Sequence, residues 1–453
     1  MSLSAVADAL GAAGLKVNIL GDDVQLDGVS TDTRCIQTGE LFLALSGPNF
    51  DGNAFAEAAM QAGAAACMLE KDMGVSPTLI VDDAHQALGL LAQHWRRQFK
   101  LPLIAVTGSN GKTTVKEMLA SIFAQKGKLL ATRGNLNNDI GMPLTLLRLN
   151  QSHDFAVIEM GANHAGEIKY LTELASPDVA LITNAAPAHL AGFGSLDGVA
   201  QAKAEIYSGL SNKGCAVFNA DDPYASLWRQ KIEAENKELR CLDFGIENKA
   251  AVQASWPSVD GQVQIDTPAG SFELRLPLLG QHNLMNALAA TAAAIGAGID
   301  IDSIRSGLEI MQAVPGRLQL KKGIADSRIL DDTYNANPAS IKAALDVLEN
   351  FSGRHFLALG DMGELGENET ALHAQVGEQA LVSGVQRLYT LGTLSHAANE
   401  AFADKAQAFS SHSSMIDCLR EDLADDVTLL VKGSRRMQME KIVHALSVEG
   451  ESN

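Results

Sequence analysis

The segment around residue 110 constrains the fold of this chain more than any other part of the sequence. An apolar run at 103–106 leads directly into TGSNGKTT at 107–114, and a helical pattern follows at once. A glycine-rich turn of this kind leaves backbone N–H groups exposed at the positive end of a helix, where a polyphosphate can bind. We therefore expect a parallel α/β domain with an ATP site here. The predicted nucleotide-binding residues are Gly108, Ser109, Asn110, Gly111, Lys112, Thr113 and Thr114.

Two side chains of this loop have predicted chemical roles. Lys112 is expected to reach the β- and γ-phosphates, and the Thr113 hydroxyl is expected to bind Mg²⁺. The loop is shorter than the general pattern GxxxxGK[ST], because Val106 occupies the position of its first glycine. A GTPase is disfavoured, since every Asn-Lys pair in the chain lacks the aspartate of a guanine-reading NKxD motif.

Strand and helix patterns alternate along the rest of the chain. At roughly 150 residues per domain, 453 residues suggest about three domains. We expect an α/β fold with a small N-terminal α/β domain over 1–100, a central P-loop domain with a parallel sheet over 101–314, and a C-terminal Rossmann-like domain over 315–453. Expected helices lie at 54–63, 84–99 and 283–296, and a small β excursion is expected within 250–279. Expected strands lie at 17–20, 39–45, 64–69, 78–81, 103–106, 155–158, 179–182, 215–218, 328–332, 355–360, 387–392 and 428–433.

The charge and cysteine content exclude several classes of partner and site. The 54 acidic residues outnumber the 35 basic ones, which leaves a formal net charge of −19. Surfaces for nucleic acid or anionic membranes need clustered Lys and Arg, so both partners are disfavoured. The five cysteines lie far apart without a CxxC pair, which predicts neither a zinc site nor disulfides. Because the chain has no secretory leader and no long apolar run, we expect a cytoplasmic protein.

Three polar residues beyond the loop are candidates for the reaction centre. Glu159 leaves an apolar strand into a glycine turn, where a carboxylate that holds Mg²⁺ is expected; the alternative is a solvated acid at a strand end. His189 follows the next strand, although a single loop histidine is more often a surface residue. Lys203 lies in a helical segment, where a solvated face is the ordinary interpretation.

The combination of these motifs is more specific than any one of them. TGSNGKTT, EMGAN at 159–163, the Thr-Asn pair at 183–184 followed by His189, and AKAEIY at 202–207 resemble the Mur ligase family. Its members are cytoplasmic ATP-dependent enzymes that form amide bonds in peptidoglycan synthesis. The resemblance implies that Thr113, Glu159 and His189 bind Mg²⁺. It also implies that Lys203 carries a carbamylated amine near the metal, and that Lys112, His189 and Lys203 are the catalytic residues.

Later segments resemble the nucleotide-binding parts of the same family. GQHNLMNAL at 280–288 would bring His282 and Asn283 near ATP, although Asn283 could simply cap the Ala-rich helix. In PGR at 315–317, Arg317 would donate to phosphate. DDTYNANP at 331–338 would contact the nucleotide from the C-terminal domain. The residues that the resemblance assigns there are Asp332, for the ribose, with Tyr334 and Asn335.

Four more motifs resemble the members of the family that add D-alanyl-D-alanine (D-Ala-D-Ala) to UDP-N-acetylmuramoyl-tripeptide (UDP-MurNAc-tripeptide). They are VSTDTR at 29–34, GPNFDGNAF at 47–55, GNLNNDIGMP at 134–143 and VKGSRRM at 431–437. The resemblance implies that the segments 360–367 and 432–435 hold the dipeptide, and that the enzyme is a monomer. The residues expected to bind the UDP-substrate are Ser30, Thr31, Asp32, Arg34, Asp51, Asn53 and Asn138.

Two alternative functions remain open from the sequence. One is a sister ligase that adds another amino acid to a UDP-muramoyl peptide or to folate. The other is a P-loop ATPase module that drives conformational work without ligation. The segment DDTYNANP favours a ligase, because a motor would instead need a sensor arginine.

Overall fold

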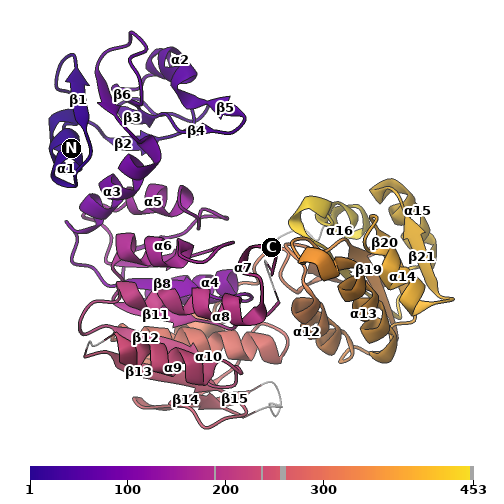
Figure 1. The fold of residues 1–453 in the computed structure, drawn as a ribbon. Coiled ribbons are helices and arrows are strands. Elements are labelled where there is room, and N and C mark those ends of the chain that lie inside the picture. Colours follow the sequence, from indigo (N-terminus) through magenta and orange to yellow (C-terminus); the bar gives the residue numbers. More distant parts are fainter. Residues whose placement is uncertain (188–189, 236–237, 256–261, 449–453) are drawn as a thin grey trace.

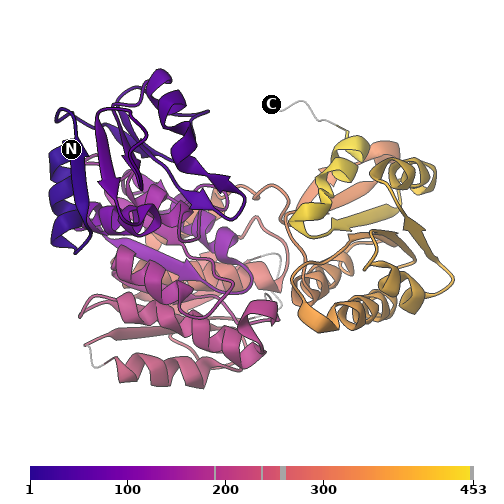
Figure 2. The ribbon, with the colours of Figure 1, turned by 45° about the horizontal axis from the view of Figure 1, so that its top comes forward.

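Three large β-sheets follow one another along the chain in the computed structural model, with a further two-stranded pair in the N-terminal part (Figure 1). The structure describes residues 1–187, 190–235, 238–255 and 262–448. The N-terminal part lies at one end of the central part, and the C-terminal part lies beside the central part in both views (Figure 1, Figure 2). The predicted mixed α/β class is therefore confirmed. The exact domain boundaries near residues 100 and 314 stay predictions.

The N-terminal part is a five-stranded sheet in the order β1-β7-β6-β3-β2. Apolar side chains of α1 and α3 cover one face of this sheet, and α2 packs against the other. The strands are β1 (Val17–Leu20), β2 (Gly28–Ser30), β3 (Glu40–Leu43), β6 (Ala66–Leu69) and β7 (Thr78–Val81), with a separate pair β4 (Ser46–Gly47) and β5 (Phe50–Asp51). The helices are α1 (Leu3–Ala12), α2 (Ala56–Gln61) and α3 (Ala84–Arg96).

The central part contains a nine-stranded sheet in the order β16-β15-β14-β13-β12-β11-β8-β10-β9. Helices α4, α10 and α11 cover one face, while α5, α6 and α9 cover the other. The strands are β8 (Leu103–Thr107), β9 (Leu129–Ala131), β10 (Phe155–Glu159), β11 (Val179–Ile182), β12 (Cys215–Asn219), β13 (Arg240–Gly245), β14 (Val252–Ala254), β15 (Val263–Thr267) and β16 (Gly270–Leu274). The helices are α4 (Lys112–Phe123), α5 (Gly141–Leu146), α6 (Glu167–Ala175), α7 (Leu190–Phe193), α8 (Leu196–Ala204), α9 (Ala225–Ala234), α10 (Gln281–Gly296) and α11 (Ile301–Glu309).

The order of the central strands indicates by topology alone where a ligand crevice is expected. Strand β8 pairs in parallel with β10 on one side and with β11 on the other. After β8 the chain builds β9 and β10 first, and then crosses to β11 and the strands beyond it. Ligands of open α/β sheets bind at the carboxyl ends of strands where the order reverses in this way. The TGSNGKTT loop lies at this point.

The C-terminal part contains a six-stranded sheet in the order β17-β18-β22-β19-β20-β21. All neighbouring strands are parallel except β17, which pairs with β18 in the antiparallel sense. The strands are β17 (Gln319–Lys322), β18 (Arg328–Asp332), β19 (Arg354–Gly360), β20 (Arg387–Leu391), β21 (Ala406–Phe409) and β22 (Val427–Lys432). The helices are α12 (Pro338–Leu348), α13 (Glu369–Val382), α14 (His396–Phe402), α15 (His412–Asp422) and α16 (Glu440–Leu446).

Every strand expected from an apolar run is present, and the β excursion expected within 250–279 contains β14, β15 and β16. Helix α3 ends at Arg96, earlier than expected, and Arg96 is buried and donates to the carbonyls of Phe99 and Ala175. None of the helices in the described ranges has the length and apolar character that crossing a bilayer requires.

Candidate active site

The turn between β8 and α4 has a backbone shape that only glycine adopts easily. Gly108 has φ +145° and Gly111, which precedes the first residue of α4, has φ +81°. A Cβ on Gly108 would overlap Thr183 Oγ1, and one on Gly111 would overlap Asn286 Oδ1. Both glycines are therefore needed for the conformation and for the close approach of neighbouring side chains.

Residues at the end of β11 hold this loop in place. Asn184 Oδ1 accepts from the backbone N–H of Asn110 at 2.9 Å, and Thr183 Oγ1 donates to the Asn110 carbonyl at 2.6 Å. Ser109 Oγ donates to the Ala186 carbonyl at 3.0 Å. The Thr-Asn pair noted in the sequence thus fixes the shape of the phosphate loop.

Lys112 bends back over the loop that it follows. Its Nζ donates to the Gly108 carbonyl at 2.6 Å and to the Ser109 carbonyl at 3.3 Å. Burial lowers the pKa of this ammonium, and the nearby Glu159 carboxylate opposes that shift. The cation therefore lies at the helix N-terminus, where phosphate oxygens would bind.

Glu159, the last residue of β10, provides a buried carboxylate next to the loop. Its side chain is 3% exposed; Oε2 accepts from the Thr113 hydroxyl at 3.0 Å and Oε1 accepts from Asn137 Nδ2 at 2.8 Å. Burying a carboxylate with neutral partners alone is costly, and a cation offsets that cost. Carboxylate and hydroxyl oxygens are ligands that Mg²⁺ prefers, so this donor set fits the ion. A solvated strand-end acid, the alternative from the sequence, is wrong.

The third predicted metal ligand, His189, lies outside the described residues. Within the described ranges, no group of three or more His, Cys, Asp or Glu side chains is arranged so that it could hold a metal ion. The structure therefore brings together Thr113 and Glu159. The role of His189 as a third metal ligand stays a prediction.

Lys203, near the end of α8, is buried. Its side chain is 2% exposed, so the alternative of a solvated helix face is wrong. Burial, together with the nearby Lys112 ammonium, lowers the pKa of Lys203 to about 7. Its Nζ lies 5.4 Å from the centre of the Phe193 ring, and no carboxylate of the described chain forms an ion pair with it. A large share of this amine is therefore neutral near pH 7.

Two residues of the C-terminal part touch the phosphate loop. Arg317 Nη2 donates to Thr113 Oγ1 at 3.0 Å, and its guanidinium lies 4.2 Å from the centre of the Tyr334 ring. Asn337 Nδ2 donates to Asn110 Oδ1 at 2.8 Å. The loop therefore lies at a junction of the central and C-terminal parts. Asn337 was not among the predicted site residues.

The segment that precedes Asn337 also contains the predicted Asp332 and Asn335. The Asp332 carboxylate forms an ion pair with Lys432 and accepts from the Leu318 N–H at 3.3 Å. The Asn335 carbonyl accepts from Lys432 Nζ at 2.9 Å. Lys432 thus joins the end of β18 to the backbone before α12, while Asn335 itself is exposed. The ribose contact of Asp332 stays a prediction.

The start of α10 faces both the phosphate loop and Asp332. Asn283 is the third residue of this helix and donates to the Leu279 carbonyl at 2.8 Å, so the alternative that it caps the helix is wrong: Gly280 holds that position. Burial lowers the pKa of His282, and the Asp332 carboxylate opposes the shift. Asn286 donates to Asn283 Oδ1 at 3.2 Å and lies against Gly111. Sequence reasoning missed Asn286, although it lies one helical turn beyond Asn283.

The residues expected to bind UDP form two local groups in the N-terminal part. After β2, the Arg34 side chain donates to Asp32, which lowers the pKa of Asp32 to about 2, while Ser30 Oγ donates to the Asp32 carbonyl. Thr31 lies between Ser30 and Asp32 in the sequence. Asp51 accepts from Asn53 Nδ2 at 2.8 Å, and the buried Asn53 accepts from the Glu70 N–H at 3.0 Å. Asn53 therefore has a structural role of its own.

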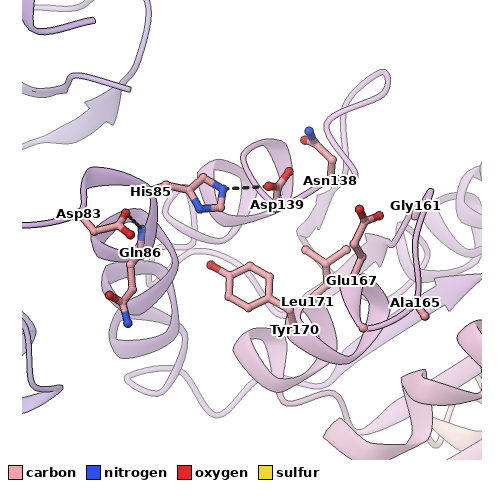
Figure 3. A pocket seen from close by; sticks show the side chains of 11 residues that line it. Asp83, His85, Gln86, Asn138, Asp139, Gly161, Ala165, Glu167, Tyr170 and Leu171 are labelled. Carbon is pink, nitrogen blue, oxygen red and sulfur yellow. Dashed lines mark hydrogen bonds and ion pairs between the residues drawn. The ribbon is translucent and has the colours of Figure 1, made fainter. Parts of the chain in front are cut away.

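Asn138, the last predicted residue of this set, lies apart from these groups on a cavity of about 530 Å³ (Figure 3). The cavity lies between α3, the loop before α5, and α6. Across it His85 Nε2 and Asp139 Oδ2 form a hydrogen bond of 2.9 Å. Asn138 follows Asn137, the partner of Glu159, so the cavity lies beside the candidate metal site. The lining residues are Asp83, His85, Gln86, Asn138, Asp139, Gly161, Ala165, Gly166, Glu167, Tyr170 and Leu171.

Comparison with protein families finds three successive Mur ligase domains along most of the chain. The description "Mur ligase family, catalytic domain" matches residues 25–96. "Mur ligase middle domain" matches residues 106–294 and "Mur ligase, glutamate ligase domain" matches residues 316–435.

Individual relatives are similar to this chain over nearly their full length. The chain is 42% identical to the UDP-N-acetylmuramoyl-tripeptide–D-alanyl-D-alanine ligase of Escherichia coli K12, over 99% of both chains. A crystal structure of MurF from Acinetobacter baumannii matches with a TM-score of 0.89 and 35% identity, over 97% of each chain. MurF ligase from Thermotoga maritima in complex with ADP matches with a TM-score of 0.81 and 26% identity, over 92% of this chain and 96% of that one.

Proposed function

This chain belongs to the Mur ligase family, and we infer that it joins D-Ala-D-Ala to UDP-MurNAc-tripeptide in an ATP-dependent step of peptidoglycan precursor synthesis. The observation that carries this conclusion is the full-length similarity to ligases of that name. A site in which the C-terminal part touches the phosphate loop supports it, because Arg317 and Asn337 lie where a nucleotide would bind.

The proposed reaction has two steps. The terminal carboxylate of the tripeptide attacks the γ-phosphorus of ATP, and the bond to the β-phosphate oxygen breaks to give an acyl phosphate and ADP. The amine of D-Ala-D-Ala then attacks the acyl carbon, and the tetrahedral intermediate expels phosphate while the amine loses a proton. Closure of the site around the acyl phosphate would protect it from water.

Residues around the loop would stabilise the charge of the transferring group. The Lys112 ammonium and the Arg317 guanidinium provide positive charge next to Thr113. Thr113 and Glu159 would hold Mg²⁺, with His189 as the further predicted ligand; the ion, when bound, neutralises phosphate oxygens. In the proposal, Lys203 carries a carbamate that approaches this metal, and its buried, partly neutral amine supports that role.

The other two hypotheses explain less. A sister ligase with another amino acid does not account for the name shared by the full-length relatives. A P-loop ATPase that performs only conformational work does not account for a C-terminal sheet whose residues reach the phosphate loop. We further propose that the protein acts in the cytoplasm as a monomer and uses Mg²⁺. Its five isolated cysteines support the cytoplasmic location.

Release of inorganic phosphate from ATP tests the proposed function. We expect sustained release only when UDP-MurNAc-tripeptide and D-Ala-D-Ala are both present, because the dipeptide amine must cleave the acyl phosphate. With the tripeptide alone, we expect at most about one turnover per enzyme. Phosphate release that is indifferent to both substrates would contradict the ligase function.

We propose that the peptide part of the UDP-substrate occupies the cavity shown in Figure 3. Asn138 supports this, because its Oδ1 accepts from the Gly141 N–H at 2.9 Å while its amide N–H₂ group is available to a ligand. Asn138→Asp keeps the accepting oxygen but replaces the donor by a negative charge next to an anionic substrate. We expect the KM for UDP-MurNAc-tripeptide to rise about tenfold, with the KM for ATP nearly unchanged.

Steady-state kinetics with each substrate varied in turn would measure this effect. Asn150→Asp is the matched control, because Asn150 is exposed and its Oδ1 likewise accepts from a nearby backbone N–H, that of Ser152. An unchanged KM for the UDP-substrate in Asn138→Asp would remove Asn138 from the substrate site.

A further inference from the structure

Lys432 is a buried lysine at the carboxyl end of the C-terminal sheet. It is the last residue of β22, its side chain is 3% exposed, and its direct neighbour in β18 is Asp332. The Nζ atom forms an ion pair with Asp332 Oδ2 and donates to the Asn335 carbonyl at 2.9 Å. Two of the three donors of this ammonium therefore bind within the protein.

The partners of Lys432 belong to the two segments that reach the phosphate loop. Asp332 Oδ1 accepts from the N–H of Leu318, the residue after Arg317, at 3.3 Å. The Tyr334 N–H donates to the Gly316 carbonyl at 3.1 Å, which joins the two segments directly. Arg317 contacts Thr113, and Asn337 contacts Asn110. A continuous set of polar contacts therefore leads from Lys432 to the nucleotide loop.

We propose that Lys432 is a positioning residue for the nucleotide and not a ligand of the dipeptide. It neutralises Asp332 and holds the Asn335 carbonyl, and so orients Arg317 and Asn337 toward the phosphate loop. The proposal rests on the nucleotide site of the proposed function. Loss of Lys432 leaves a largely buried carboxylate without its cation and a carbonyl without its donor, and both effects loosen the segments that the lysine joins.

Binding of ADP with Mg²⁺, in the absence of both other substrates, tests the proposal. We expect Lys432→Met to raise the Kd for ADP at least about tenfold, because Arg317 and Asn337 lose their fixed positions. Lys432→Arg, which keeps the charge, is expected to give a Kd between those of Lys432→Met and the unsubstituted protein. In both variants the KM for D-Ala-D-Ala should stay within about twofold of its original value.

Lys321→Met is the matched control, because Lys321 forms a neighbouring ion pair of 2.7 Å with Asp331, whose side chain is 4% exposed. Asp331 keeps its bond of 2.7 Å with Thr333 Oγ1 when that lysine is removed, so ADP should bind as before. Thermal unfolding identifies which variants fold. If Lys432→Met does not fold, the Kd of Lys432→Arg for ADP alone tests the proposal.

Two results would overturn the proposal. One is a folded Lys432 variant that binds ADP as tightly as the unsubstituted protein. The other is a KM for D-Ala-D-Ala that rises more than the Kd for ADP, which would make Lys432 a contact of the dipeptide. If the unsubstituted protein itself does not bind ADP, the proposed function fails and this inference fails with it.

Discussion

Glu159→Gln should nearly abolish Mg²⁺-dependent turnover while leaving the fold intact. The glutamine has the same shape, and its amide oxygen can still accept from Asn137 Nδ2. The substitution removes the negative charge, and with it the strongest candidate ligand for the cation. It also places an amide N–H₂ group where Oε2 accepts from the Thr113 hydroxyl. We expect kcat to fall by about a factor of 100 to 1,000, since loss of one aligned electrostatic group costs roughly 3 to 4 kcal/mol in comparable sites.

The same substitution should leave the metal-free protein at least as stable. Glu159 is 3% exposed and its side-chain hydrogen bonds come from the neutral groups of Thr113 and Asn137, so removing its charge relieves a desolvation cost. Loss of the attraction to the nearby Lys112 ammonium offsets only part of that gain. Thermal unfolding without Mg²⁺ should therefore occur at the same or a higher temperature. Added Mg²⁺ should raise the unfolding temperature of the unsubstituted protein more than that of the variant.

Glu173→Gln serves as the control, because Glu173 lies on the exposed side of α6 in the same part of the chain. Turnover and the Mg²⁺ response should both persist in it. If Glu159→Gln retains turnover, Glu159 does not belong to the metal site.

The sequence predicts the sheets well where the strands are buried on both faces. Runs such as 103–106 and 179–182 are continuously apolar because helices cover both sides of the central sheet. Strand β17 was not predicted, since it lies at a sheet edge and its sequence QLKK alternates exposed and half-buried residues. Strand β21, with the sequence AQAF, was missed at the opposite edge of that sheet, where none of its residues is fully buried.

The site was predictable in its parts but not in its contacts. The phosphate loop follows from local spacing, since its glycines and the start of α4 are adjacent in sequence. The bond between Asn110 and Asn337 joins residues 227 positions apart, so no local pattern could reveal it. The burial of Lys203 also depends on packing against other elements, because a lysine in a polar helical stretch is normally solvated.

Lys203→Ala should be nearly inactive, with partial recovery on addition of short carboxylic acids. Burial lowers the pKa of Lys203 to about 7, so at pH 8 most of the amine is neutral and can attack CO₂. The nitrogen forms a bond to carbon and loses a proton, which leaves an anionic carbamate. Alanine removes this group and opens a space that acetate or formate can enter, bringing a carboxylate to the place of the carbamate.

We expect kcat of Lys203→Ala to fall by about a factor of 1,000, and acetate to restore activity severalfold in a saturable manner. Lys169→Ala is the control, because the Lys169 side chain is 60% exposed on α6. It should be fully active and indifferent to acetate. For the unsubstituted enzyme freed of bicarbonate, reactivation at one fixed concentration of dissolved CO₂ should be faster at pH 8 than at pH 6, where the amine is mostly protonated. Full activity of Lys203→Ala would show that the buried amine serves packing alone, and a loss of activity that no carboxylate restores would argue against the carbamate.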